Sequence, residues 1–231
     1  MRKSWLISQR LLWQNRWLFL LLMLWPYLMA GILLVGGSPD PDDVIWMLHQ
    51  ECFAGLALVA VTGSTLLGNE QRTRRIITVL SRAVSRPMYL FALLITAWLP
   101  LVLYASGFVA SGMILANRTQ HSWQGVLLMA LLQLILGVWA GAVSIFWSVL
   151  LPQVIASIVS VASLALAAYI STLGLPGPGR LLATLFEISI SGHNAAGTMW
   201  FDGAATLVAG AVWFAAASWV FSLRDLNLTA D

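Results

Sequence analysis

Long apolar runs separated by short polar segments dominate the pattern along the chain. A helix needs about 20 mostly apolar residues to cross a hydrocarbon core of about 30 Å. Six runs meet this requirement, so the pattern predicts an all-α, polytopic membrane protein that forms a single transmembrane domain over residues 1–231. The expected spans are 17–35, 44–67, 88–115, 123–151, 154–173 and 204–223.

Composition excludes several classes of protein. Hydrophobic residues make up 60% of the 231 positions and charged residues 9%, whereas soluble domains carry about 25% charged residues. A soluble enzyme is therefore excluded. A lone Cys52 rules out an intramolecular disulfide and a Cys-x-x-Cys site. Because Lys3 is the only lysine, no lysine follows a glycine-rich phosphate-binding turn. We expect no enzyme activity and no cofactor in this chain, with any ATP and Mg in a partner subunit.

The distribution of charge predicts the orientation. Cytoplasmic loops of membrane proteins are enriched in Lys and Arg. If the N-terminus is cytoplasmic, every one of the 12 basic residues except Arg118 and Arg180 falls inside. Most acidic residues then fall outside, namely Asp40, Asp42, Asp43, Glu51, Glu187 and Asp202. Both termini are therefore expected in the cytoplasm.

The N-terminal segment 1–16 is basic and rich in tryptophan. This composition suits an interfacial helix that lies along the inner leaflet. It equally suits the ordinary basic flank of a first transmembrane span. The sequence leaves both interpretations open.

The cytoplasmic segment 68–87 reads GNEQRTRRIITVLSRAVSRP. Wound as a helix from Glu70 to Arg82, it places Thr73 and three apolar residues on one face and most of the basic residues on the other. Pro87 ends such a helix, since proline disfavours helical backbone in the residue before it. The basic amphipathic helix either adheres to anionic lipid or docks into a partner subunit and transmits force.

Part of this segment resembles a known family. The residues concerned are Glu70, Ile76, Leu80, Ser81, Val84, Ser85, Arg86, Tyr89 and Leu90. They are similar to the loop between the second and third spans of type-2 ATP-binding-cassette (ABC) transporter permeases, in which an acid precedes a Leu-Ser-x-Pro-Val-Ser-Arg signature. Two positions depart from the family, because Ala83 replaces its proline and Leu93 stands where a lysine often follows. The six spans, interfacial helix and helical outer segment also have counterparts in the family.

The resemblance implies a permease subunit that forms a translocation path in the bacterial plasma membrane. Segment 70–82 would be the coupling helix that sits in a groove of a separate ATPase subunit. A second permease subunit, identical or related, would complete the path, and the expected cargo is an exported amphiphilic or lipid-like substrate. The expected ATPase contacts are Glu70, Arg72, Arg74, Arg75, Ile76, Leu80, Arg82 and Arg86. The alternative is a non-transporting scaffold subunit of a membrane complex, and neither interpretation involves nucleic acid.

The segment 174–203 is expected on the outer side. It begins with the helix-breaking sequence Gly-Leu-Pro-Gly-Pro-Gly, and residues 180–190 then fit a helix. One face of this helix carries Leu181, Leu182, Leu185, Phe186 and Ser189. The pattern predicts either a partly embedded lid or an ordinary interfacial loop.

Few residues inside the spans carry chemistry. Glu51 falls in the first turns of the second span, where a carboxylate is costly unless it faces a cavity or a partner, so it is the candidate for lining a pathway. His49, His121 and His193 match no metal-ligand spacing, so no metal site is expected. Gly137 and Gly141 form G-x-x-x-G, which we interpret as a helix-packing site.

Overall fold

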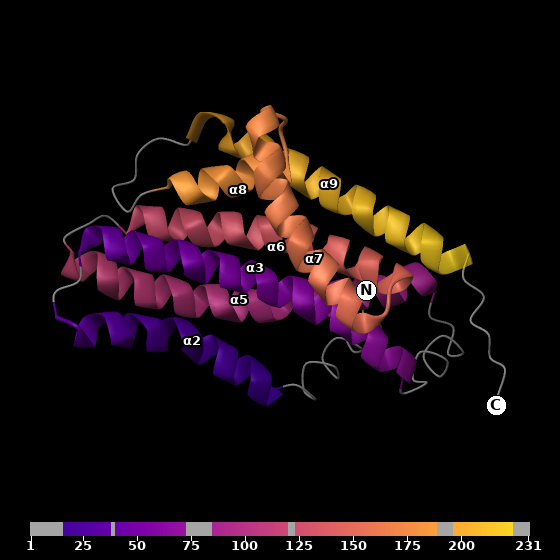
Figure 1. The fold of residues 1–231 in the computed structure, drawn as a ribbon, viewed down its shortest axis with the longest axis horizontal. Helices are drawn as coiled ribbons and strands as arrows, with labels where there is room; N and C mark the ends of the chain where they lie inside the picture. The colour runs from indigo at the N-terminus through magenta and orange to yellow at the C-terminus, as the bar shows by residue number, and fades with distance from the viewer. Residues whose placement is uncertain (1–15, 38–39, 73–84, 120–122, 189–195, 224–231) are drawn as a thin grey trace.

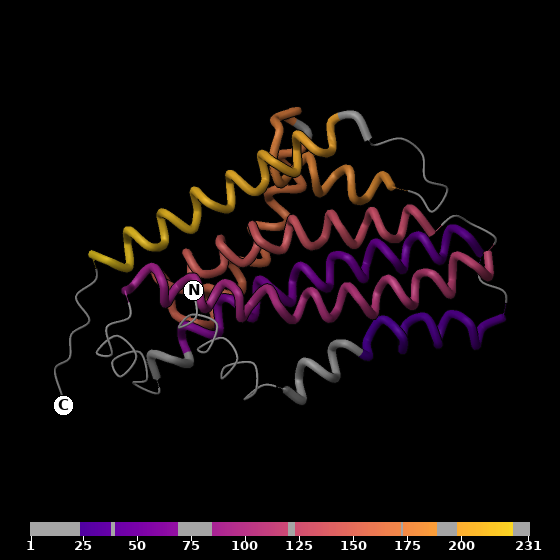
Figure 2. The backbone as a smooth tube through the Cα atoms, turned by 180° about the vertical axis from the view of Figure 1, so that it is seen from behind, coloured from indigo at the N-terminus to yellow at the C-terminus, as the bar shows by residue number. Residues whose placement is uncertain are grey.

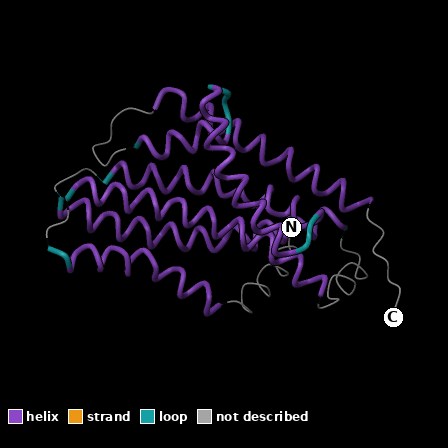
Figure 3. The backbone as a smooth tube through the Cα atoms, in the orientation of Figure 1, coloured by secondary structure: helices purple, strands orange, loops and turns teal. Residues whose placement is uncertain are grey.

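The computed structural model describes residues 16–37, 40–72, 85–119, 123–188 and 196–223. Every regular element in these residues is a helix, and they contain no strand (Figure 3). The elements are α2 (Arg16–Val35), α3 (Pro41–Arg72), α5 (Arg86–Arg118), α6 (Gln124–Leu150), α7 (Gln153–Ile170), the short 3-10 helix η1 (Ser171–Leu173), α8 (Pro178–Glu187) and α9 (Ala196–Leu223). The expected all-helical architecture is confirmed.

Five of the described helices are long and apolar enough to cross a membrane. These lie at 41–68, 86–118, 124–150, 153–170 and 198–223. The chain is therefore a multi-pass helical membrane protein. The sixth expected span, 17–35, falls on α2 (Arg16–Val35), of which only the side chains from Leu24 to Val35 are described, and that apolar stretch is shorter than a full span. Six spans thus remain a prediction.

Helix α6 lies at the centre of the bundle (Figure 1). It packs against α3, α5 and α9, while α2 runs beside α5 on the far side. The reverse view in Figure 2 shows the same order of α2, α5, α3 and α6. In the most apolar 18-residue stretch of α6, 67% of the residues are buried. In the corresponding stretches of α7 and α9, only 22% are buried. Helices α7 and α9 therefore present most of their apolar surface outward.

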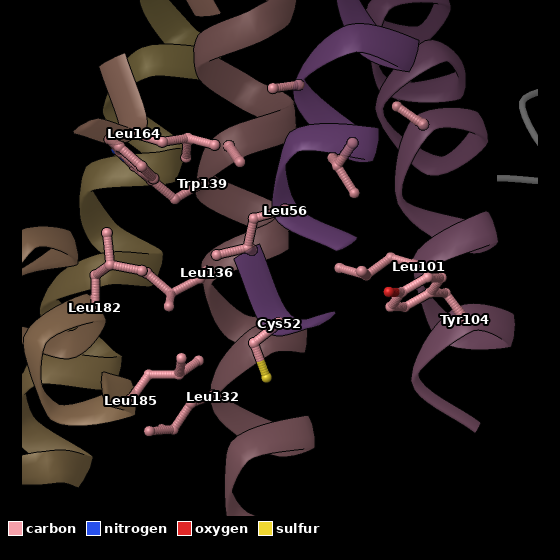
Figure 4. Close-up of a cluster of buried hydrophobic side chains, with 14 of the residues drawn as sticks. Cys52, Leu56, Leu101, Tyr104, Leu132, Leu136, Trp139, Leu164, Leu182 and Leu185 are labelled. Carbon is pink, nitrogen blue, oxygen red and sulfur yellow. The ribbon is translucent and has the colours of Figure 1, made fainter. Parts of the chain in front are cut away.

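Leucines from five helices fill the interior (Figure 4). Leu132 and Leu136 of α6 lie in the same buried cluster as Leu56 of α3 and Leu182 of α8. Figure 4 also shows Leu164 of α7 and Leu101 of α5 in this cluster. The apolar side chains that predicted membrane insertion thus also hold the helices together.

The G-x-x-x-G pair of α6 faces other helices of the same chain. Gly137 lies against Leu101 of α5, and Gly141 lies against Val59 of α3. A short side chain at these positions lets the neighbouring helices approach closely, which is a common packing mode in lipid. The expected packing role is therefore observed within the chain.

The segment that was expected on the outer side forms a short helix after a break in the chain. Gly174 has φ 68° and Gly177 has φ 140°, values that glycine adopts without a Cβ penalty. Helix α8 then runs from Pro178 to Glu187, so it begins and ends earlier than residues 180–190. The leucines of its expected apolar face are buried, whereas Phe186 is exposed and Ser189 lies outside the described residues. Helix α8 packs on α7, α9 and α6.

Candidate functional site

Glu51 lies well inside the bundle. It is ten residues after Pro41, the first residue of α3, which places it about 15 Å along the helix axis at about 1.5 Å per residue. Its exposed fraction is 4%. A carboxylate at this depth is stabilised only by polar partners, because lipid offers none.

The partners of Glu51 come from neighbouring helices. The hydroxyl of Tyr104, on α5, donates a hydrogen bond to Oε2 of the Glu51 carboxylate. The same hydroxyl lies 3.1 Å from the backbone carbonyl oxygen of Glu51. The indole of Trp25, on α2, also lies close to this carboxylate. Glu51 therefore joins α3 to α5 and α2.

Gln133, on α6, also contacts the backbone of α3 beside Glu51. Its Nε2 atom donates to the carbonyl oxygen of Cys52 at 3.1 Å and lies 3.5 Å from that of Glu51. The side chain is fully buried, and its Oε1 atom has no hydrogen-bond partner among the described residues. Gly55 permits this approach, because a Cβ atom there would overlap Gln133 Nε2.

We call Glu51, Tyr104 and Gln133 the polar cluster. It contains a carboxylate, a phenol and a carboxamide, and all three side chains face the interior of the bundle. Glu51 therefore lines no open surface of the chain in this structure. Sequence reasoning missed Tyr104 and Gln133 because partners on different helices share no sequence spacing. An amide in the middle of the apolar run 123–151 was the available signal.

Arg86 connects the start of α5 to the end of α9. Its Nη1 atom donates to the carbonyl oxygen of Phe221 at 3.0 Å and to that of Ser222 at 2.8 Å. The guanidinium also lies 5.9 Å from the centroid of the Phe221 ring. The last carbonyls of a helix have no partner within it and carry partial negative charge, so a cation stabilises them. The structure thus shows Arg86, an expected ATPase contact, bound to its own chain.

The expected coupling helix begins as a continuation of α3. Helix α3 extends to Arg72 rather than ending at residue 67, so Glu70 and Arg72 belong to it. Residues 73–84 lie outside the described part of the chain. The expected contacts at Arg74, Arg75, Ile76, Leu80 and Arg82 fall in that segment.

Two polar contacts hold α8 at the opposite end of the bundle. Arg180 Nε lies 3.4 Å from Oδ2 of Asp202, on α9. Asp202 is fully buried, and neither carboxylate oxygen has a hydrogen bond within the part of the chain that the structure describes, so Arg180 supplies its compensating charge. His49 Nε2, on α3, lies 3.1 Å from the carbonyl oxygen of Ile188, just after α8. Helix α8 is thereby tied to both α9 and α3.

No metal site is found among the described residues, which contain no cluster of three or more potential ligands. His49 instead packs edge-on against Phe186, with ring centroids 5.5 Å apart. His121 and His193 lie outside the described residues.

Comparison of the sequence with protein-family models and with curated proteins gives no match. The class that fold and composition define is a multi-pass helical membrane protein with a buried polar cluster between its helices. Any narrower function rests on the segment 70–90 and on the contacts at the two ends of α9.

Proposed function

We propose that this chain is a permease subunit of an ABC transporter. In this proposal it has six spans, with both termini in the cytoplasm of a bacterial cell. ATP is hydrolysed in a separate subunit that receives the coupling helix 70–82. The resemblance of residues 70–90 to the permease signature supports this function, and so do the apolar helices that follow it.

The observation that carries the proposal is the pair of contacts at the two ends of α9. Helix α9 has 28 residues, which corresponds to about 42 Å at about 1.5 Å per residue. Near its C-terminus it accepts hydrogen bonds from Arg86, at the end of the permease-like signature. Near its N-terminus Asp202 pairs with Arg180 of α8. One helix therefore joins the cytoplasmic segment to the outer helix.

Through these contacts, movement of the ATPase subunits would reach the opposite side of the membrane. Closure of the ATPase subunits on ATP would displace the coupling helix and, through Arg86, the cytoplasmic end of α9. Because a helix is stiff, the motion would reach Asp202 and shift α8, which acts as a lid over the outer mouth. Export of an amphiphilic or lipid-like substrate is the direction that we propose.

The outward faces of α7 and α9 offer room for a second permease subunit. Large apolar side chains are exposed along both helices, among them Ile155 and Ile158 of α7 and Val208, Val212 and Trp219 of α9. Such surface is stable in contact with lipid or with another apolar helix. We propose that part of it forms the interface between the two permease subunits.

Copurification tests the proposal. The tagged chain is purified from native membranes, and its partners are identified by mass spectrometry. We expect an ABC-type ATPase to copurify with the wild-type chain and to be lost from Arg74→Glu/Arg75→Glu. The control is Asp43→Lys, a charge reversal at the exposed opposite end of α3, which should retain the ATPase.

Two outcomes would contradict the proposal. One is an ATPase that binds and turns over equally with the double reversal, since the coupling helix would then not be its docking site. The other is a stable complex of the wild-type chain with integral membrane proteins but no ATPase, which would favour the scaffold function.

A further inference from the structure

A groove opens at the end of the bundle opposite Arg86, where α5 gives way to α6. Its volume is about 620 Å³, and its lining is Met113, Ile114, Asn117, Arg118 and Trp123. The first four residues recur one helical turn apart, so they share a face of α5. The fifth immediately precedes α6. All five are exposed, so the groove is accessible from the surroundings of the chain.

The groove changes from apolar to cationic along α5. Met113 and Ile114 lie about 6 Å deeper along the helix than Asn117 and Arg118, at about 1.5 Å per residue. Helix α5 has 33 residues and spans about 50 Å, so its ends reach beyond a hydrocarbon core of about 30 Å. The apolar pair therefore lies toward the acyl chains, and Arg118 lies toward the headgroups.

The charge of Arg118 lacks a counterion in the described part of the chain. It forms no ion pair with a carboxylate there, unlike Arg180 with Asp202. A guanidinium matches the geometry of a phosphate group through two parallel hydrogen bonds. Asn117 adds an amide donor, and the Trp123 indole offers an N–H donor on a ring suited to the membrane–water interface.

We infer that this groove binds an anionic phospholipid, with its phosphate on Arg118 and one acyl chain along Met113 and Ile114. The apolar and charged residues follow one another along the groove in the same order as the acyl chain and the charged headgroup of a phospholipid. Charge complementarity favours a lipid over an apolar protein segment, which would leave the guanidinium unpaired. The groove lies at the end of α5 opposite Arg86, so we expect lipid binding to require neither ATP nor the ATPase subunit.

Native mass spectrometry of the full chain in detergent tests this inference. The protein is titrated with phosphatidylglycerol and, separately, with phosphatidylcholine of the same acyl chains. We expect the wild type to retain phosphatidylglycerol preferentially. We expect Arg118→Gln to weaken its binding about fivefold, since one basic residue near an anionic surface contributes about 1 kcal/mol. Binding of phosphatidylcholine should not change.

Two further variants distinguish the effect of the Arg118 charge from a general effect of substitution on the fold. Arg118→Lys keeps the charge but not the fork geometry, so it should lie between wild type and Arg118→Gln. Asp43→Asn changes one charge at an exposed site outside the groove and should not lower the affinity. Equal affinity of wild type and Arg118→Gln for phosphatidylglycerol would overturn the inference. Competition by inorganic phosphate as effective as that by the lipid would also overturn it, because the groove would then hold an anion without its chain.

Discussion

The hydroxyl of Tyr104 on α5 donates to the carboxylate of Glu51 on α3, inside the apolar part of the bundle. Both side chains are buried, so neither can exchange its partner for water. This contact and the Trp25 indole compensate a carboxylate that lipid could not solvate.

Removing this hydroxyl should destabilise the protein. Tyr104→Phe removes the hydroxyl that donates to the buried carboxylate, and we expect a loss of about 1–3 kcal/mol in the free energy of unfolding. Thermal unfolding of the purified protein in detergent measures it, with Glu51→Gln and the double variant completing a cycle. Because the residues are in contact, the effects should be non-additive by about 0.5–3 kcal/mol. Additive effects would show that the pair is energetically independent.

Arg86 should stabilise the C-terminal end of α9. Arg86→Gln removes the cation that binds the carbonyls of Phe221 and Ser222, so the last turn of α9 should exchange its amide hydrogens faster. We expect a local loss of about 1–3 kcal/mol, as for hydrogen bonds to charged groups. Hydrogen exchange with mass spectrometry gives the measurement. Arg86→Lys, which keeps a positive charge, should be milder, and equal protection in all three proteins would contradict the role.

The same variant separates a structural role of Arg86 from a role in coupling. If α9 transmits the movement of the coupling helix, Arg86→Gln should still copurify the ATPase but should reduce stimulation of ATP hydrolysis by substrate. Arg74→Glu/Arg75→Glu should instead lose the ATPase itself. A fully coupled Arg86→Gln complex would contradict the route through α9.

The ion pair at the other end of α9 should respond unequally to removal of its two partners. Arg180→Gln leaves the buried Asp202 carboxylate uncompensated, whereas Asp202→Asn removes the charge that needs compensation. Because the Arg180 side chain is 39% exposed, we expect about 1–3 kcal/mol for Arg180→Gln and less for Asp202→Asn. Thermal unfolding of both variants decides the order, and the reverse order would show that Asp202 finds another partner.

Gly179 should be intolerant of a side chain. A Cβ atom at this position of α8 would overlap the backbone carbonyl oxygen of Ala167 on α7, which cannot rotate away. We expect Gly179→Ala to cost about 1–3 kcal/mol, as overpacking does. Gly31→Ala is the matched control, because a Cβ atom in α2 meets no atom within 4 Å. The control should be neutral or stabilising by up to about 1 kcal/mol, as thermal unfolding would show.

The sequence predicted the helices because their main determinant is local. Apolar runs long enough to span a bilayer identify themselves without knowledge of their neighbours. The glycines and prolines of 174–179 indicated the break between η1 and α8, although α8 already begins at Pro178. The expected span ends at residue 67, close to the end of the candidate span at Gly68, whereas helix α3 itself continues further. Asn69 and Glu70 are polar but still helix-compatible, so polarity alone does not end α3, which continues to Arg72.

Pairing between helices depended on the tertiary structure. The sequence indicated that Glu51 needs a partner, but it could not name Tyr104, Gln133 or Trp25, because helix rotation and order decide which faces meet. The same applies to Arg86 and Asp202, which were interpreted by their charge and side of the membrane. Hydropathy thus determined that this chain resides in lipid, and packing alone decided which buried polar groups compensate one another.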